Sequence, residues 1–110
     1  EIFVGTTGRV LDHLNRGNID FTAIKTVVLD EADQMLKLGF KEDIEEILRF
    51  VRRQCKEDLQ VCLFSATIPS WVRQVANYHM KQNARLIDLV IELKNKTSRT
   101  VQHLAISCPY

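Results

Sequence analysis

Residues 25–33 read Lys-Thr-Val-Val-Leu-Asp-Glu-Ala-Asp, an apolar and β-branched run that ends abruptly in acidic residues. Such a run is typical of a buried strand in a parallel sheet. The carboxylates of Asp30 and Glu31 then follow the strand's C-terminal end, where open α/β sheets bind their ligands. One carboxylate can hold Mg²⁺ through water while its neighbour orients or deprotonates an attacking water. An apolar run followed by two acids is common, and a strand that simply ends in a solvated acidic turn also explains the pair, so both interpretations stay open.

Other apolar runs extend this pattern along the chain. Residues 2–4 and 61–64 predict two more buried strands, residues 86–91 contain a fourth apolar run, and a further strand is expected to start in residues 101–107. Strands that alternate with helices predict a three-layer α/β fold with a parallel sheet.

Helices are expected between these runs. Apolar residues recur at three- and four-residue steps from Val10 to Leu14, before Gly17, and again from Phe40 to Val51. Pro69 is well placed near the start of a third helix.

Three polar clusters follow predicted strands, namely Thr6-Thr7-Gly8-Arg9, Asp30-Glu31-Ala32-Asp33 and Ser65-Ala66-Thr67. The C-terminal ends of parallel strands lie at one edge of a sheet, so we expect the clusters to form a shared surface there. The Ser-Ala-Thr cluster taken alone also fits a turn that satisfies its own backbone groups.

The three clusters, in this order and spacing, resemble the motifs of DEAD-box ATP-dependent RNA helicases, and the similarity continues through Gln34-Met35-Leu36, Gly39-Phe40 and Leu63-Phe64. The tail, Trp71-Val72 and Ile87-Asp88-Leu89 resemble the nucleolar Gu branch of that family. The resemblance implies the C-terminal portion of a RecA-like domain of the P-loop NTPase fold. It also implies an intracellular protein, located in the nucleus or nucleolus.

The resemblance assigns a role to each matching residue. Asp30 would hold the Mg²⁺ of bound ATP, and Glu31 would act as general base or position the attacking water. Asp33 would accept hydrogen bonds from Ser65 and Thr67, which would couple the nucleotide site to closure onto the second RecA-like domain.

Residues Thr6, Thr7, Gly8 and Arg9 resemble the family's RNA-contacting Thr-Pro-Gly-Arg motif, with threonine at position 7 in place of proline. A helix N-terminus offers free N–H groups to a phosphate, and glycine allows close approach. Arg9 could contact phosphate or brace the loop through an internal carboxylate. The loss of proline's fixed φ puts the rigidity of this loop in doubt, and an ordinary helix cap remains the alternative.

Composition sets limits on these assignments. The formal net charge of +1 argues neither for nor against a nucleic-acid partner. Cys55, Cys62 and Cys108 fit neither a disulfide framework nor a zinc site, which favours reduced thiols in an intracellular compartment. No apolar run approaches the ~20 residues of a membrane span.

The sequence contains no Gly-x-x-x-x-Gly-Lys-Thr phosphate loop. We therefore interpret residues 1–93 as the C-terminal part of the first RecA-like domain and residues 94–110 as an interdomain linker and the start of the second. The chain alone should neither hydrolyse ATP nor bind it tightly, and uncovered strand edges should make it self-associate. A non-catalytic module that binds RNA or a partner is the alternative function.

Overall fold

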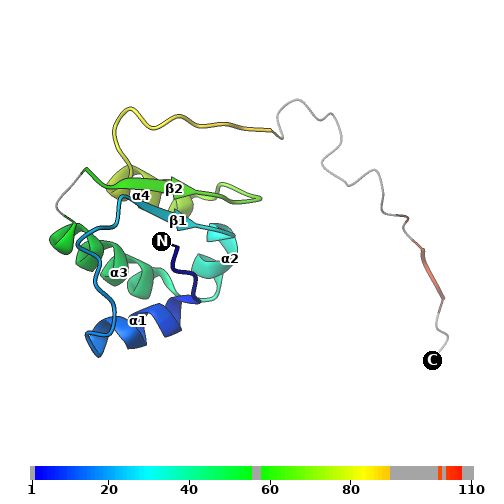
Figure 1. The fold of residues 1–110 in the computed structure, drawn as a ribbon. Helices are drawn as coiled ribbons and strands as arrows, with labels where there is room; N and C mark the ends of the chain where they lie inside the picture. Colours follow the sequence, from blue (N-terminus) through cyan, green and yellow to red (C-terminus); the bar gives the residue numbers. More distant parts are fainter. Residues whose placement is uncertain (1, 56–57, 90–101, 103, 108–110) are drawn as a thin grey trace.

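The computed structural model describes residues 2–55, 58–89, 102 and 104–107. Its elements follow in the order α1 (Thr7–Asn15), β1 (Thr26–Leu29), α2 (Ala32–Lys37), α3 (Lys41–Gln54), β2 (Gln60–Leu63) and α4 (Ser70–His79) (Figure 1). No helix among these residues is long and apolar enough to cross a bilayer.

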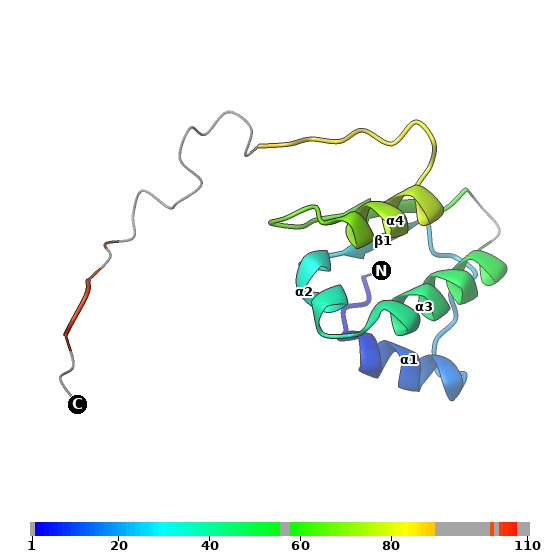
Figure 2. The ribbon, with the colours of Figure 1, turned by 180° about the vertical axis from the view of Figure 1, so that it is seen from behind.

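Strands β1 and β2 lie side by side and parallel, with Thr26 opposite Gln60 and Leu29 opposite Leu63. The connection between them contains α2 and α3, as a parallel pair requires a helical crossover. Figure 2, the view from behind, brings α4 in front of the strands and shows α3 beside it. The expected α/β fold with a parallel sheet is therefore confirmed.

The core lies between one face of the sheet and the helices. Strand alternation turns Val27 and Leu29 to this face, opposite Val61 and Leu63 of β2. The helices contribute a buried set that shares the same cluster: Leu14, Ile44, Leu48, Val51 and Val75. Because all of these side chains pack on one face, the described residues form a sheet covered by helices on a single side.

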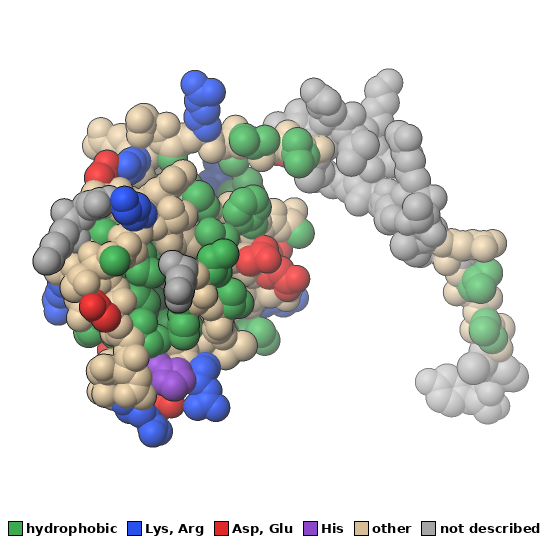
Figure 3. Space-filling view, in the orientation of Figure 1, with side chains coloured by type: hydrophobic (Ala, Val, Ile, Leu, Met, Phe, Trp, Pro, Cys, Tyr) green, Lys and Arg blue, Asp and Glu red, His purple; other side chains and the backbone are tan. Residues whose placement is uncertain are grey.

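The opposite face of the sheet is open. Val28 points away from the core and is 56% exposed, and Phe64, just beyond β2, is 58% exposed. Figure 3 shows hydrophobic side chains gathered on the side of the molecule that faces the viewer. A third layer of a RecA-like domain would cover this face.

Local sequence explains where the helices begin and end. The helix expected after Gly5 is found as α1, and Gly17 follows it with a φ of +66°, a conformation that glycine adopts most easily. The helix expected near Pro69 is α4, with Pro69 as its N-cap. Helix α3 carries acidic residues in its first turn and basic residues in its last, which suits the helix dipole.

The strand predicted over residues 2–4 is wrong. Ile2 and Val4 are 92% and 86% exposed, and no strand forms there. Residues 86–89, part of the apolar run over residues 86–91, are exposed and irregular, and so are residues 102 and 104–107, where a further strand was expected to start. A strand requires a neighbour that pairs with its N–H and C=O groups, and apolar composition does not supply one. Most of the interdomain linker expected within residues 94–110 lies outside the described residues.

Candidate functional site

The two clusters that follow β1 and β2 lie together, as predicted. Phe64 N–H donates to the Leu29 carbonyl at 2.8 Å, and Ala32 N–H donates to the Phe64 carbonyl at 3.0 Å. These two bonds continue the ladder past the ends of the strands. They bring residues 30–33 and 65–67 to one edge of the sheet.

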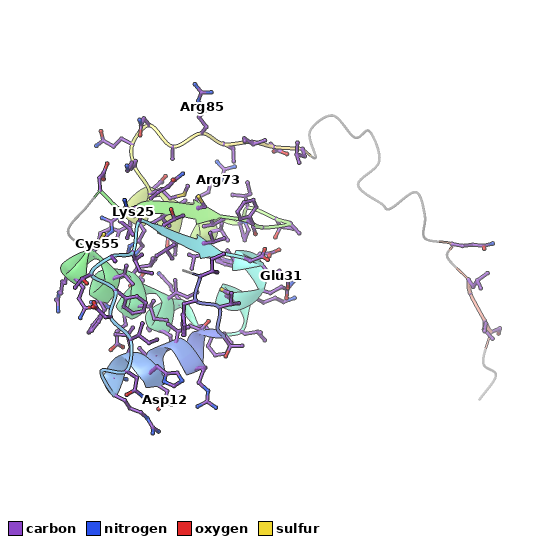
Figure 4. All side chains as sticks on the ribbon, viewed as in Figure 1. Asp12, Lys25, Glu31, Cys55, Arg73 and Arg85 are labelled. Carbon is purple, nitrogen blue, oxygen red and sulfur yellow. The ribbon has the colours of Figure 1, made fainter. Side chains whose placement is uncertain are left out.

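Asp30 and Glu31 are both exposed at this edge. One Asp30 carboxylate oxygen, Oδ1, accepts the N–H of Glu31 at 2.9 Å, which fixes the side chain against the backbone. Figure 4 shows Glu31 beside α2, at the end of the sheet farthest from Lys25.

Glu31 has a φ of +50°, the only positive value at a non-glycine position among the described residues. Two constraints impose it. The Ala32 N–H must reach the Phe64 carbonyl, while the Glu31 carbonyl already accepts from Gln34 and Met35 at 2.9 and 3.1 Å to begin α2. This left-handed conformation costs about 1 kcal/mol or more for a residue other than glycine.

Asp33 joins the two clusters. The Thr67 hydroxyl donates to Asp33 Oδ2 at 2.8 Å, as the family resemblance implied. The Ser65 hydroxyl behaves differently, because its oxygen accepts the Asp33 N–H at 3.2 Å and its proton goes to the Thr67 carbonyl at 2.6 Å. A hydroxyl has a single proton, so the expected donation from Ser65 to the carboxylate is replaced by a bond to the backbone.

These contacts keep Asp33 ionised. The side chain is nearly buried, at 7% exposure. The hydroxyl of Thr67 lowers the pKa of the Asp33 carboxyl below its ordinary value, and the N–H groups of Gln34 and Thr67 act in the same direction. Burial opposes them with a smaller effect than that of Thr67.

Residues 6–9 form the start of α1. Thr6 is the N-cap, and its side chain makes no capping hydrogen bond. Thr7, which stands where the family motif has proline, is the first helical residue and is buried at 8% exposure. The first intrahelical bond runs from the Val10 N–H to the Thr6 carbonyl at 2.9 Å, so the preceding N–H groups of this turn are without an intrahelical acceptor.

Gly8 sits in this turn without packing against the rest of the described chain. A Cβ built on it would meet no atom within 4 Å. Glycine in a helix is less stable than alanine by about 1 kcal/mol. Neither helix formation nor packing within the described residues therefore requires glycine here.

Arg9 lies on the exposed side of α1. Its Nη1 is 3.3 Å from Asp12 Oδ2, and Arg16 Nε donates to Asp12 Oδ1 at 2.8 Å. The hydrogen bond from Arg16 is the main reason that the pKa of the Asp12 carboxyl is lowered, and the charge of Arg9 adds to it. The internal carboxylate considered for Arg9 is thus Asp12, whose i+3 spacing from Arg9 already signalled the pair.

The arrangement suits phosphate chemistry. A Mg²⁺ ion binds proteins through one or two carboxylates, keeps several waters and takes its remaining ligands from substrate phosphates. The exposed Asp30 carboxylate has an oxygen besides the one that accepts the Glu31 N–H, and no group of three or more metal ligands occurs in the described part of the chain. One exposed carboxylate therefore fits a mostly hydrated Mg²⁺ and not a cage of protein ligands.

Comparisons with known proteins define the class to which this site belongs. Residues 1–75 match the family model of the DEAD/DEAH box helicases. The chain belongs to this family.

The chain is similar to particular members of this family. The chain is 49% identical over 108 residues to DEAD-box ATP-dependent RNA helicase 7 of Arabidopsis thaliana, and 49% identical over 109 residues to Nucleolar RNA helicase 2 of Rattus norvegicus. The yeast DEAD-box splicing factor Prp28 has a similar solved structure, with a TM-score of 0.67 and 32% identity over 69% of this chain and 17% of that one.

The chain spans only a small part of the length of these relatives. The matches include 98% of this chain and only 16% and 14% of the Arabidopsis and rat proteins. The predicted RecA-like fold is confirmed by the similarity to Prp28.

Proposed function

We propose that this chain is the part of an ATP-dependent RNA helicase that supplies the acidic nucleotide site, the coupling contact and one RNA contact. The observation that carries this proposal is the joining of residues 30–33 and 65–67 at one sheet edge through the bond between Thr67 and Asp33, at 2.8 Å. The parent protein would couple ATP binding and hydrolysis to RNA binding and local duplex unwinding.

Asp30 and Glu31 divide the work at the nucleotide. Asp30 would hold the Mg²⁺ of ATP through water, and the ion would neutralise charge on the phosphates. Glu31 would accept a proton from the attacking water or fix its direction. Its backbone is held by Ala32 and α2, so the carboxylate starts from a defined position.

Asp33, Ser65 and Thr67 would transmit closure. The Thr67 hydroxyl donates to the Asp33 carboxylate, the Ser65 oxygen accepts the Asp33 N–H, and the Ser65 hydroxyl donates to the Thr67 carbonyl. Movement of the Ser-Ala-Thr turn must therefore move Asp33, in the first turn of α2. The second RecA-like domain would act on this turn when it closes. Coupling of this kind requires a connected element with two arrangements.

The start of α1 would bind the RNA backbone. The N–H groups of Thr7, Gly8 and Arg9 have no intrahelical acceptor and suit a phosphate, and the exposed Arg9 guanidinium belongs to the same turn. Phosphate contacts position a strand without reading its sequence. The bond to Asp12 would hold Arg9 on the helix until a phosphate replaces that carboxylate.

We further infer that residues 1–93 belong to the first RecA-like domain and that residues 94–110 lead into the second. The family model's match to residues 1–75 supports the first assignment. A nuclear or nucleolar location is supported by the similarity to Nucleolar RNA helicase 2.

Glu31→Gln in the full-length protein tests the catalytic assignment. Glutamine keeps the size of the side chain but cannot take a proton, so single-turnover hydrolysis should fall about 10²- to 10⁴-fold. Affinity for Mg·ATP and RNA should persist, because Asp30 is unchanged.

Asp30→Asn is the matched variant, and it should weaken Mg²⁺-dependent ATP binding itself. Hydrolysis at the normal rate by Glu31→Gln would overturn the assignment. A protein that binds RNA equally well with both variants and never hydrolyses ATP would instead be the non-catalytic binding module.

A further inference from the structure

His79, the last residue of α4, is only 2% exposed. Neither of its ring nitrogens has a hydrogen-bond partner within the described residues. A neutral imidazole carries one donor and one acceptor, and buried polar atoms in proteins nearly always find partners. This orphaned ring marks a place where the described residues leave hydrogen-bonding capacity unused.

The His79 ring helps to line a pocket of about 150 Å³ between α3 and α4, together with Glu45, Arg49 and Tyr78. Tyr78 is 75% exposed, and its ring stands edge-on to the imidazole with ring centres 4.8 Å apart. Arg49 uses its Nε to donate to the Glu45 carbonyl at 3.1 Å. Its two terminal nitrogens make no hydrogen bond or ion pair within the described residues.

Two arginines and one carboxylate act on the His79 ring: burial lowers its pKa most, the charges of Arg52 and Arg49 add to this, and the charge of Glu45 opposes it. The last turns of α3 carry Arg49, Arg52 and Arg53, and the Arg52 guanidinium donates to the His79 carbonyl. Glu45 is the single carboxylate of the lining, and it already faces Lys41 at 4.0 Å.

The pocket lies away from the candidate catalytic edge. Helices α3 and α4 both run toward the end of the sheet where β1 begins, and Cys55, just after α3, donates to the Ile24 carbonyl at 2.9 Å. Figure 4 shows Cys55 and Lys25 at this end and Glu31 at the other. The pocket also opens between helices, not on the uncovered sheet face where further layers of a RecA-like domain would pack.

We propose that the α3–α4 pocket docks an acidic segment of a partner protein. A partner carboxylate fits the volume, accepts from the terminal nitrogens of Arg49 and from the Tyr78 hydroxyl, and lies against the His79 ring. Arginine and tyrosine are the residue types that most often anchor protein interfaces, and Tyr78 presents its ring to solvent. Because the pocket lies away from the sheet edge that carries residues 30–33, the partner can remain bound while those residues bind a nucleotide.

Fluorescence anisotropy with the full-length protein tests the proposal. The probe is a fluorescein-labelled twelve-residue peptide of Asp, Glu and Gly, and a Lys-Gly peptide of equal length is the control probe. Arg49→Glu should lower affinity for the acidic peptide about tenfold or more, the loss expected of one charge-assisted hydrogen bond. Arg73→Glu, an equal charge change at an exposed position nearer the start of α4, should leave affinity within about twofold.

Tyr78→Ala guards against misfolding of the charge variant, because so exposed a side chain can be removed without opening the core. This variant should also lower the affinity for the acidic peptide about tenfold, as loss of an aromatic anchor does. Equal losses with Arg49→Glu and Arg73→Glu would overturn the proposal in favour of unspecific charge attraction. Absence of measurable peptide binding, or a loss of RNA affinity with Arg49→Glu while peptide affinity persists, would overturn it as well.

Discussion

Gly8→Ala should separate the needs of the RNA contact from the needs of the fold. Gly8 is helical, and an added Cβ would have no atom of the described chain within 4 Å. If the absence of a side chain serves the approach of a phosphate, alanine should harm RNA binding and spare the protein. Stability and RNA affinity should therefore change in opposite directions.

The magnitudes follow from the local geometry. Alanine should stabilise α1 by about 0.5–1 kcal/mol, because it restricts the unfolded chain and forms helix more readily. A methyl group forced against a closely bound phosphate should cost about 1–3 kcal/mol by analogy with overpacking, which corresponds to roughly 5- to 150-fold in affinity.

The assay pairs urea unfolding with titration of single-stranded RNA at fixed salt, using the full-length protein. Gly17→Ala is the control. Its φ of +66° is unfavourable for alanine, so that variant should lose about 1 kcal/mol of stability and keep its RNA affinity. Gly8→Ala with unchanged RNA affinity, or with stability lowered as much as in Gly17→Ala, would refute the reasoning.

Three further predictions concern single contacts. Arg9→Ala should lower the affinity for all single-stranded RNAs equally and reduce the slope of log K against log salt by about 0.7. An unchanged slope would show that Arg9 stays with Asp12. Thr67→Val should retain ATP binding but uncouple hydrolysis from unwinding. Because Thr67 lowers the pKa of Asp33 in the folded protein, the variant should be less stable than the parent above about pH 3.8. The two stabilities should converge as pH falls through the lowered pKa, which acid unfolding will measure. Burial lowers the pKa of His79 below 6.5, so the unfolded chain binds more protons and stability should fall as pH drops from about 6.5. His79→Leu should flatten that fall and add about 1 kcal/mol, and an unaltered pH profile would contradict it.

The sequence predicts a strand correctly where an apolar run also has a neighbour to pair with. Residues 26–29 and 60–63 are short, mostly apolar runs that pair with each other, so composition and structure agree. Residues 2–4 have the same composition and form no strand, because pairing depends on a neighbour and not on the run itself. Helix α2 was not predicted, since six residues that directly follow an acidic pair carry too little periodicity.

The candidate site shows the same division. The convergence of residues 30–33 and 65–67 follows from parallel strands that end at one edge, and the sequence predicted it. The particular bond between Asp33 and Thr67 was implied only by the family resemblance. The direction of the Ser65 bonds depends on which acceptor lies nearest its single proton, at 2.6 Å, and no spacing rule reveals that. The orphaned nitrogens of His79 are equally invisible in the sequence, because they arise from how α3 and α4 pack.

The positive φ of Glu31 has a consequence for anyone who would engineer this protein. A redesign that ranked substitutions by stability alone would rank glycine or asparagine at position 31 highly, since either adopts a φ of +50° at lower energy than glutamate does. Such a redesign would select against the very carboxylate proposed to act on water. Thermal screens of this family's members should therefore hold position 31 fixed, because improvement in melting temperature there and retention of turnover are opposed objectives.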